Sequence, residues 1–378
     1  MHLSNIFILF ILASSFTLAK PTSTNRSIIT RAPAFSSTAH HVIENILPHA
    51  VETHEVIHVP DSDNMLFISQ KSNSVLLKVR VDSHGLVHDL AAFNIGHSTD
   101  GLHGLVASTY YPGLVWVTLQ SGNKLLLLDP AKDSIHTPPK IIKEINVPQP
   151  GQGPHRILEY GQELWSTLMD NSYILRINHV KPSDYSLYRT LPEPIFGVIH
   201  PLNNKYYTSE RLVSAFMAID PVSGATHQVP VPAEQGMQPL GIMEGPGGLW
   251  FTLLGNETFA TGTFGVILQD ETIKYFRLQS PLGKDAALLY IAFDLEHTTN
   301  RVLWLLSSSI INDRALDMMI RVTMDEQWEH IVAEEVTVFP TQLSKAHRIL
   351  QTPTNMFVTL LASSKLLSYY PHGSSIAQ

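Results

Sequence analysis

Short hydrophobic runs separated by polar turn residues recur along most of the chain. Three segments share one pattern, in which an aliphatic stretch and a turn precede an aromatic-x-Thr strand; they span residues 102–129, 154–177 and 239–256. Weaker copies span 53–79 and 346–370. β-Branched and aromatic residues bounded by Gly, Asn and Asp are typical of half-buried strands. Apolar residues keep no helical spacing after the N-terminal segment, so the pattern predicts an all-β chain.

The copies are spaced like the blades of a β-propeller. Aligning them places one residue of each copy at a common anchor position, and successive anchors lie 41 to 58 residues apart. These anchors are His54, His103, His155, Phe196, Leu240, Leu289 and His347. A period of about 40 to 50 residues suits one four-stranded blade. We therefore predict a single seven-bladed β-propeller, with six blades as the alternative because two of the copies are weak.

The two ends of the repeat region predict how the ring closes. The last copy ends after three strands, whereas residues 40–48 resemble an outer strand that precedes the first anchor. Pairing of these ends would remove unpaired strand edges, which promote aggregation. We predict a propeller domain over 39–378, closed by an N-terminal strand, and a Ser-, Thr- and Pro-rich tail over 20–38.

Residues 1–19 are typical of a secretory signal peptide. An apolar run from Ile6 to Leu12 is followed by small residues and a cleavage-like Thr17-Leu18-Ala19. The run is much shorter than the ~20 residues that span a bilayer, which argues against a membrane anchor. Glycosylation sequons at Asn25 and Asn256 agree with export. We expect a secreted, glycosylated monomer.

Composition excludes several classes of function. The 378 residues are 44% hydrophobic and 15% charged, which suits a large core. The chain has no Cys, so it lacks a thiol nucleophile, Cys-based metal sites and disulfides. A formal net charge of -8 without a basic cluster argues against a nucleic-acid partner.

One literal metal motif occurs, the H-E-x-x-H of His54 to His58. It binds zinc when a helix places both histidines on one face. Here the segment is rich in β-branched residues and lies in register with a repeat strand. Four residues along a strand span about 13 Å, too far for two imidazoles to share one ion. We therefore predict no zinc site in this segment.

The repeats resemble those of a known family. The segments "GQGPHRILEYGQELWSTLMDNSYILRI" and "QPLGIMEGPGGLWFTLLGN" are similar to the repeat unit of virginiamycin B lyase-type (streptogramin lyase-like) propellers. The resemblance covers about residues 50–370 and implies a seven-bladed propeller. It also implies opening of a cyclic depsipeptide by elimination at an ester bond. That reaction would use a divalent metal, histidines at the P-H-x-I position and glutamates that end the W-F-T-E strand.

Compared residue by residue, this chain keeps the histidines and replaces the glutamates. Four anchors hold histidine, whereas the glutamate position holds Gln70, Leu119, Leu168, Leu253 and Leu360, with Ser209 or Glu210 in one weak copy. Leucine cannot bind Mg²⁺, which takes oxygen ligands. We expect no cofactor; Mg²⁺ would be bound only if other ligands retain the family site.

Equivalent positions of a propeller face the same axial region, so we expect the four anchor histidines to converge. If the leucines face this region as the matching glutamates do, they would form an apolar pocket beneath the imidazoles. The alternative is that the leucines fill the blade cores.

These residues suggest a small-molecule site without a metal. A pair of imidazoles can exchange a proton near neutrality, so we assign acid/base catalysis to His155, His347 and His103. The residues assigned to substrate binding are His54, Leu119, Leu168, Leu253, Leu360, Arg156 and Arg348. The two arginines form rim salt bridges in the alternative interpretation.

The predicted function is elimination or cyclisation of an apolar natural product by a secreted lyase or cyclase, as in secondary metabolism. Two alternatives stay open: a metal-dependent streptogramin-type lyase, and a non-catalytic propeller that binds a ligand or a protein. Converging histidines in a closed cavity would favour an enzyme. A filled axis with an exposed apolar patch would favour the binding propeller.

Overall fold

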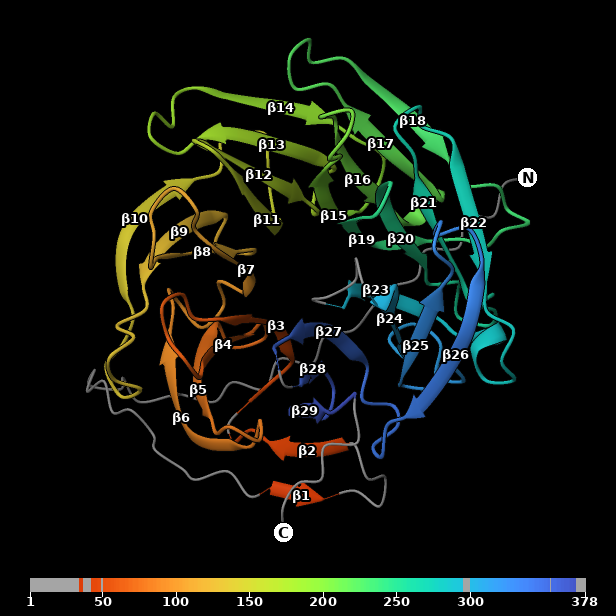
Figure 1. The fold of residues 1–378 in the computed structure, drawn as a ribbon. Coiled ribbons are helices and arrows are strands. Elements are labelled where there is room, and N and C mark those ends of the chain that lie inside the picture. Colours follow the sequence, from red (N-terminus) through yellow and green to blue (C-terminus); the bar gives the residue numbers. More distant parts are fainter. Residues whose placement is uncertain (1–33, 37–41, 49, 295–299, 354, 372–378) are drawn as a thin grey trace, which may run out of the picture.

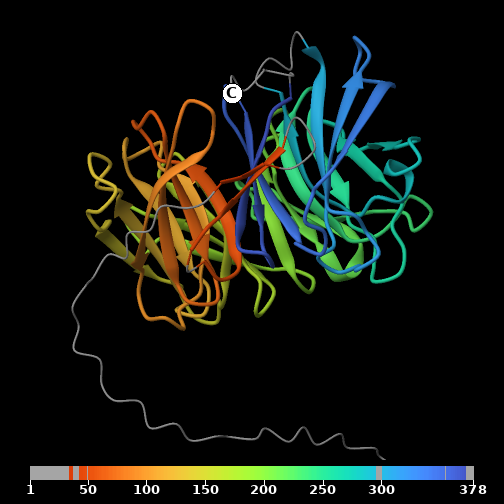
Figure 2. The same ribbon diagram turned by 90° about the horizontal axis from the view of Figure 1, so that it is seen from below.

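Seven antiparallel sheets surround a central axis in a computed structural model that describes residues 34–36, 42–48, 50–294, 300–353 and 355–371 (Figure 1). The fold is a seven-bladed β-propeller, so the predicted fold class is confirmed and six blades are excluded. Seen from the side, the strands nearest the viewer run between the two faces of the ring (Figure 2). The described helical segments are the 3-10 turns η1 (Arg211–Val213) and η2 (Gly283–Asp285), and none of the described helices is long and apolar enough to span a membrane.

Each of the first three blades consists of four strands in chain order. Blade 1 contains β3 (Thr53–His58), β4 (Met65–Gln70), β5 (Val75–Val81) and β6 (Val87–Asn94). Blade 2 contains β7 (Leu102–Ala107), β8 (Val115–Leu119), β9 (Lys124–Asp129) and β10 (Lys140–Asn146). Blade 3 contains β11 (Pro154–Tyr160), β12 (Glu163–Leu168), β13 (Tyr173–Asn178) and β14 (Tyr185–Arg189).

The next three blades repeat this order. Blade 4 contains β15 (Pro194–Ile199), β16 (Tyr206–Glu210), β17 (Ala215–Ile219) and β18 (Thr226–Pro230). Blade 5 contains β19 (Pro239–Gly245), β20 (Gly248–Leu253), β21 (Thr263–Ile267) and β22 (Ile273–Arg277). Blade 6 contains β23 (Leu288–Phe293), β24 (Val302–Ser307), β25 (Met318–Met324) and β26 (Ile331–Val338).

Blade 7 joins the two ends of the chain. It contains β27 (Ala346–Gln351), β28 (Met356–Leu360) and β29 (Lys365–Tyr369), and β29 pairs antiparallel with β2 (Val42–Ile46). β1 (Ala34–Ser36), within the predicted tail, pairs with β2. Glu44 accepts a hydrogen bond from Lys365 Nζ at 2.6 Å. Closure of the ring by an N-terminal strand is therefore confirmed, whereas the predicted signal peptide and Asn25 lie outside the described residues.

The anchor residues lie on the innermost strands, and every one of these seven strands is irregular at the anchor. The pairing of β3 with β4, for example, shifts between Thr53 and Val56, and that of β27 with β28 shifts between Ala346 and Arg348. Such a β-bulge bends the strand and redirects a side chain, as is common next to active sites. The bulges therefore turn the anchor side chains toward the axis.

A hydroxyl group bridges neighbouring blades at the bulge in at least four places. It accepts a hydrogen bond from the amide that follows the anchor and donates one to the innermost strand of the next blade. The residues are Ser69, Thr118, Thr167 and Thr359. Thr359 accepts from Arg348 N at 3.1 Å and donates to the His54 carbonyl at 2.7 Å. We name this contact the inter-blade hydroxyl bridge, and it accounts for the Thr of the sequence repeat.

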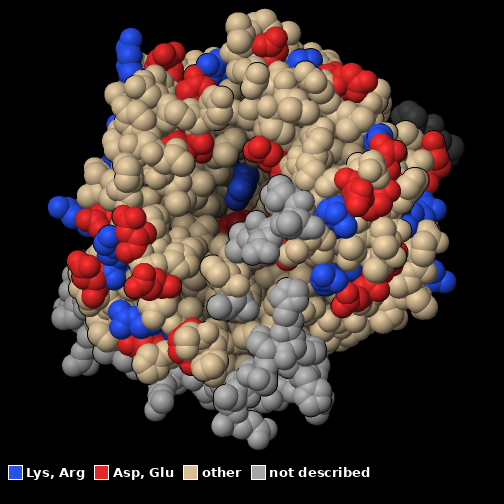
Figure 3. Space-filling view, viewed as in Figure 1, with Lys and Arg blue, Asp and Glu red and all other residues tan. Residues whose placement is uncertain are grey.

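The aromatic residue of the same motif fills the cores. Trp116, Trp165, Trp250 and Trp304 are at most 1% exposed and pack with aliphatic residues of two neighbouring blades. Charged side chains of both signs are spread over the face seen in Figure 3, which is hollowed at its centre.

Replacing Thr359 by Val should lower the free energy of unfolding by about 1–3 kcal/mol. The variant keeps the side-chain shape but leaves the buried Arg348 amide and His54 carbonyl without their hydroxyl partner. Chemical denaturation would measure the change, with Thr226→Val on an exposed position of β18 as the matched control. Equal stability of the two variants would contradict the role given to the inter-blade hydroxyl bridge.

Candidate functional site

The four anchor histidines come from consecutive blades and form an arc around the axis. Successive ring centroids lie 3.8 Å apart for His347 and His54, 3.9 Å for His54 and His103, and 3.9 Å for His103 and His155. The innermost strands β27, β3, β7 and β11 carry them. The four residues are 1 to 7% exposed. The convergence expected from the repeat is therefore present, and we refer to these four residues as the imidazole arc.

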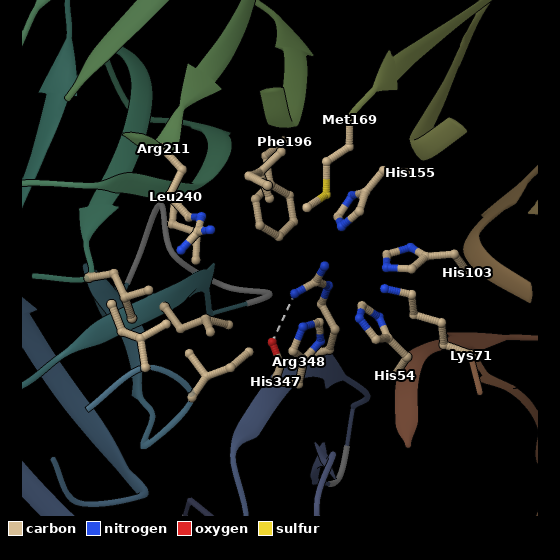
Figure 4. Close-up of a pocket in the computed structure, with 15 residues that line it drawn as sticks. His54, Lys71, His103, His155, Met169, Phe196, Arg211, Leu240, His347 and Arg348 are labelled. Atoms are coloured by element: carbon tan, nitrogen blue, oxygen red, sulfur yellow. Dashed lines mark hydrogen bonds between the residues drawn. The ribbon is translucent and has the colours of Figure 1, made fainter. Parts of the chain in front are cut away.

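The imidazole arc forms one side of a cavity of about 250 Å³ on the axis (Figure 4). The opposite side is apolar, because the remaining three anchors are Phe196, Leu240 and Leu289. Further apolar lining comes from Ile195, Leu254, Ile310, Ile311 and Met169. The cavity thus has a nitrogen-rich half and a hydrocarbon half.

The leucines assigned to substrate binding do not line this cavity. Leu119, Leu168, Leu253 and Leu360 are at most 1% exposed and pack in the hydrophobic clusters of the blades. The next residue along the chain faces the axis instead, as Met169 and Leu254 do. Of the two sequence interpretations, filling of the blade cores is the one that the structure supports.

The sequence interpretation missed two cations because of this one-residue offset. Lys71 follows Gln70 and Arg211 follows Glu210, and both side chains reach the cavity. Arg211 Nε donates to Glu193 at 2.6 Å, whereas Lys71 Nζ has no hydrogen-bond or ion-pair partner among the described residues. Moving the repeat alignment by one position would have identified both.

A buried charge cluster lies next to the imidazole arc. Arg348 Nη2 is 2.5 Å from Glu55 Oε1, and Arg156 Nη1 is 3.9 Å from Glu55 Oε2. The Arg348 guanidinium extends from blade 7 to within 4.3 Å of the Phe196 ring centroid in blade 4. Arg348 and Glu55 are 2% and 3% exposed. The Arg348 salt bridge is therefore buried and does not lie on the rim.

The imidazoles are neutral at pH 7. Burial lowers the pKa of His54 to about 4, although Glu55 beside it acts in the opposite direction. Burial also holds the pKa values of His103, His155 and His347 well below their usual range, and neighbouring positive charges lower them further. Burial alone would raise the pKa of Glu55, but Arg348 holds it well below its usual range, so Glu55 is ionised.

Several ring nitrogens of the arc are buried without a hydrogen-bond partner among the described residues. They are Nδ1 of His54, His103, His155 and His347, and Nε2 of His103. Buried polar atoms are normally paired, so groups left unpaired next to a cavity suggest a ligand. These nitrogens could accept a proton from a bound molecule or donate one to it.

Glu210 has the carboxyl that the family pattern would place on a metal. It pairs with Pro194 across the bulge of blade 4, as Leu168 pairs with Pro154 in blade 3, so it is the structural equivalent of the leucines. It does not line the cavity described above. Burial raises its pKa to about 9, so the carboxyl is neutral at pH 7. A neutral acid in this position is a poor cation ligand.

The donor set does not fit the divalent metal implied by the resemblance. Within the described ranges, His54, Glu55 and His347 form a group whose ligand atoms lie within 4.8 Å of one another. This group offers a single carboxylate, which Arg348 already binds, whereas Mg²⁺ takes mainly oxygen ligands. Lys71 and Arg348 would also repel a cation.

Two other sequence predictions concern the H-E-x-x-H segment and Asn256. His54 to His58 form strand β3 rather than a helix, and only His54 reaches the axis, since the His58 Nδ1 contacts the Val59 carbonyl at 3.1 Å. The strand separates the two histidines along its length, whereas the zinc motif needs a helix that places them side by side. Asn256 lies in the connection between β20 and β21, with an exposed Thr258, and its glycosylation remains a prediction.

Comparison with known proteins gives structural matches alone. No family model and no curated protein matches the chain. Its structure is similar to virginiamycin B lyase from Staphylococcus aureus, with a TM-score of 0.64 and 18% identity over 87% of this chain and 98% of that one. A catalytically inactive variant of that lyase with quinupristin has a TM-score of 0.65 and 19% identity over 87% of this chain and 98% of that one. YCF48 bound to D1 peptide has a TM-score of 0.58 and 15% identity over 90% of this chain and 99% of that one. At these identities the likeness shows a shared fold and leaves the chemistry to the residues of this chain.

Metal removal should leave the protein unchanged. We expect no stoichiometric divalent metal in the purified protein by elemental analysis, and no shift of the melting temperature after dialysis against EDTA. The reason is that Glu55, the one carboxylate beside the imidazole arc in the part of the chain that the structure describes, is neutralised by Arg348. A loss of stability that one added metal restores would contradict this assignment.

The free energy of unfolding should fall as the pH is lowered from 6.5 toward 4. The unfolded chain takes up protons at the histidines near pH 6.5, whereas the native imidazole arc stays neutral, so the stability present above pH 6.5 is progressively lost. The lowered pKa of His54 alone accounts for a loss of about 3 kcal/mol in the free energy of unfolding. Denaturant titrations at several pH values would measure it.

A His103→Phe variant tests whether the buried imidazoles cause this pH dependence of the free energy of unfolding. Removing this imidazole should reduce the loss between pH 6.5 and 5 by about 2 kcal/mol, because one proton-binding difference disappears. The exposed His84→Gln is the control and should follow the parent protein. Parallel pH profiles for the parent and His103→Phe would contradict a neutral, buried arc.

Proposed function

We propose that this protein is an enzyme that binds an apolar small molecule in the axial cavity and catalyses an elimination or a cyclisation by acid/base chemistry. The observation that carries the proposal is the imidazole arc facing an apolar wall inside a closed ring. An apolar cavity with a few convergent polar groups is the usual composition of a small-molecule site. We also propose that the enzyme is secreted, because the N-terminal segment has signal-peptide features.

His54 is the best-placed general base. Its Nδ1 lies 3.7 Å from Glu55 Oε1, whose negative charge would stabilise the imidazolium formed on protonation. With a proton on Nδ1, Nε2 is the basic atom. This order of roles differs from the sequence-based assignment, which gave catalysis to His155, His347 and His103 and binding to His54.

The chemistry can be written for a substrate with an oxygen leaving group. His54 removes a proton from carbon, the electron pair of that C–H bond forms the double bond, and the oxygen departs with its bonding pair. The imidazole of His103, whose ring centroid lies 3.9 Å from that of His54, would accept this proton from His54 on one ring nitrogen and release the proton of its other nitrogen to the departing oxygen, so that both rings end neutral. Lys71 and Arg348 would stabilise negative charge that develops on oxygen. In a cyclisation, the apolar wall would hold the reacting parts in contact.

The metal-dependent lyase and the binding propeller each require a different feature of the site. A metal-dependent streptogramin-type lyase would need carboxylate ligands in place of the buried leucines. A binding propeller would use the same cavity without turnover. We therefore favour the metal-independent enzyme, and conversion of a substrate separates it from the binding propeller.

Turnover by the purified protein tests the proposal. A panel of apolar natural products that carry an oxygen leaving group beside an acidic C–H bond would be incubated with the protein, and mass spectrometry would detect loss of the leaving group or isomerisation. A streptogramin B antibiotic with added Mg²⁺ belongs in the panel as the test of the alternative lyase. Conversion should fall about 10²–10⁴-fold in His54→Gln.

The pH profile of that reaction gives a second readout. Because the pKa of His54 is about 4, the rate should stay constant from pH 8 to near pH 5 and decline below that. Conversion that is unaffected by His54→Gln, or a decline centred on an ordinary imidazole pKa, would contradict His54 as the base.

A further inference from the structure

The nitrogen-rich half of the cavity has more positive than negative charge. Lys71 and Arg348 both line it, and in Figure 4 both side chains point toward its centre. The carboxylate in contact with this half is Glu55, which Arg348 binds at 2.5 Å while Arg156 lies at 3.9 Å. One negative charge therefore faces two guanidinium groups. Lys71 adds a cation that has no partner among the described residues.

The remaining cation of the cavity is already paired. Arg211 donates to Glu193 Oε2 at 2.6 Å and to Gln238 Oε1 at 3.4 Å. The unpaired charge is therefore confined to the side of the imidazole arc. This places it opposite the apolar wall of Phe196, Leu240 and Leu289.

The ammonium of Lys71 acts on the whole imidazole arc. After burial, its positive charge is among the causes that lower the pKa values of His54, His103, His155 and His347. The rings are therefore neutral and can donate N–H groups to an anion without charge of their own. An unpaired charge next to apolar surface costs free energy unless a counter-ion pairs with it.

We propose that the ligand of the axial cavity is a small amphipathic anion. Its charged oxygen atoms bind Lys71 beside His54 and His103, and its hydrocarbon part packs on Phe196, Leu240 and Leu289. The cavity of about 250 Å³ equals the volume of roughly eight water molecules, which suits a ligand of about ten non-hydrogen atoms. This inference rests on the proposed function and narrows its substrate class, because the substrate would carry a negative charge in addition to its apolar part; binding of such an anion at this site can be tested without turnover.

Three probes of equal chain length test the proposal: octanoate, octanol and octylammonium. Isothermal titration calorimetry at pH 7.5 would give their affinities for the full mature chain. Octanoate should bind at least tenfold more tightly than octanol, because it alone brings a negative charge to Lys71. Octylammonium should bind more weakly than octanol.

Variants locate the effect. Lys71→Met should reduce octanoate affinity to that of octanol and leave octanol unchanged, whereas Lys71→Arg should retain the preference for the anion. Lys181→Met, in the exposed connection between β13 and β14, is the matched control and should behave as the parent. Ile310→Ser should weaken octanoate and octanol alike, because Ile310 lines the apolar half.

Equal affinities for octanoate and octanol, no octanoate binding at millimolar concentration, or an undiminished preference in Lys71→Met would each overturn the anion proposal. Its failure is distinguishable from failure of the proposed function. If octanoate binds as expected but no compound of the substrate panel is converted, the enzyme proposal is refuted and the anion site is retained. If neutral substrates are converted but octanoate binds no more tightly than octanol, the anion site is refuted and the enzyme proposal is retained.

Discussion

The inter-blade hydroxyl bridge fixes the geometry on which the cavity is built. A β-bulge leaves the amide after the anchor without its usual strand partner, and in at least four blades a buried Ser or Thr hydroxyl accepts from it. The same hydroxyl donates to the next blade, in three cases to the carbonyl of an anchor histidine itself. Unpaired buried backbone groups are costly, so the bulge and the hydroxyl are stable together. The spacing of the imidazoles follows from this contact between blades.

The cavity combines features that are separately unfavourable. Four imidazoles are buried with successive ring centroids less than 4 Å apart, and they remain neutral because burial disfavours their charged forms. Glu55 stays ionised in the same region because Arg348 binds it directly. Asp317 is also buried and accepts hydrogen bonds from the Ser344 and Ala346 amides, just before His347. Fixed partners of this kind let a site hold charge and proton acceptors without rearrangement.

The repeat made the fold, the anchor register and the closure of the ring predictable. It did not reveal Glu55 as an axial residue, because successive side chains of a regular strand point to opposite faces. The bulge removes that alternation, so His54 and Glu55 are both buried near the axis. The leucines were misplaced for a related reason. The strand ends in the core at Leu168, and the chain reaches the axis one residue later, at Met169.

The imidazole arc crosses the seam of the ring. His347 belongs to the last blade and His54 to the first, and the last blade is completed by β2 from the start of the domain. No contiguous fragment that lacks either end contains the whole site. During synthesis, the cavity therefore forms only after nearly the whole chain has emerged and its two ends have met. A ligand that bridges His347 and His54 would hold the two ends together, so occupancy of the cavity would slow the opening of the ring.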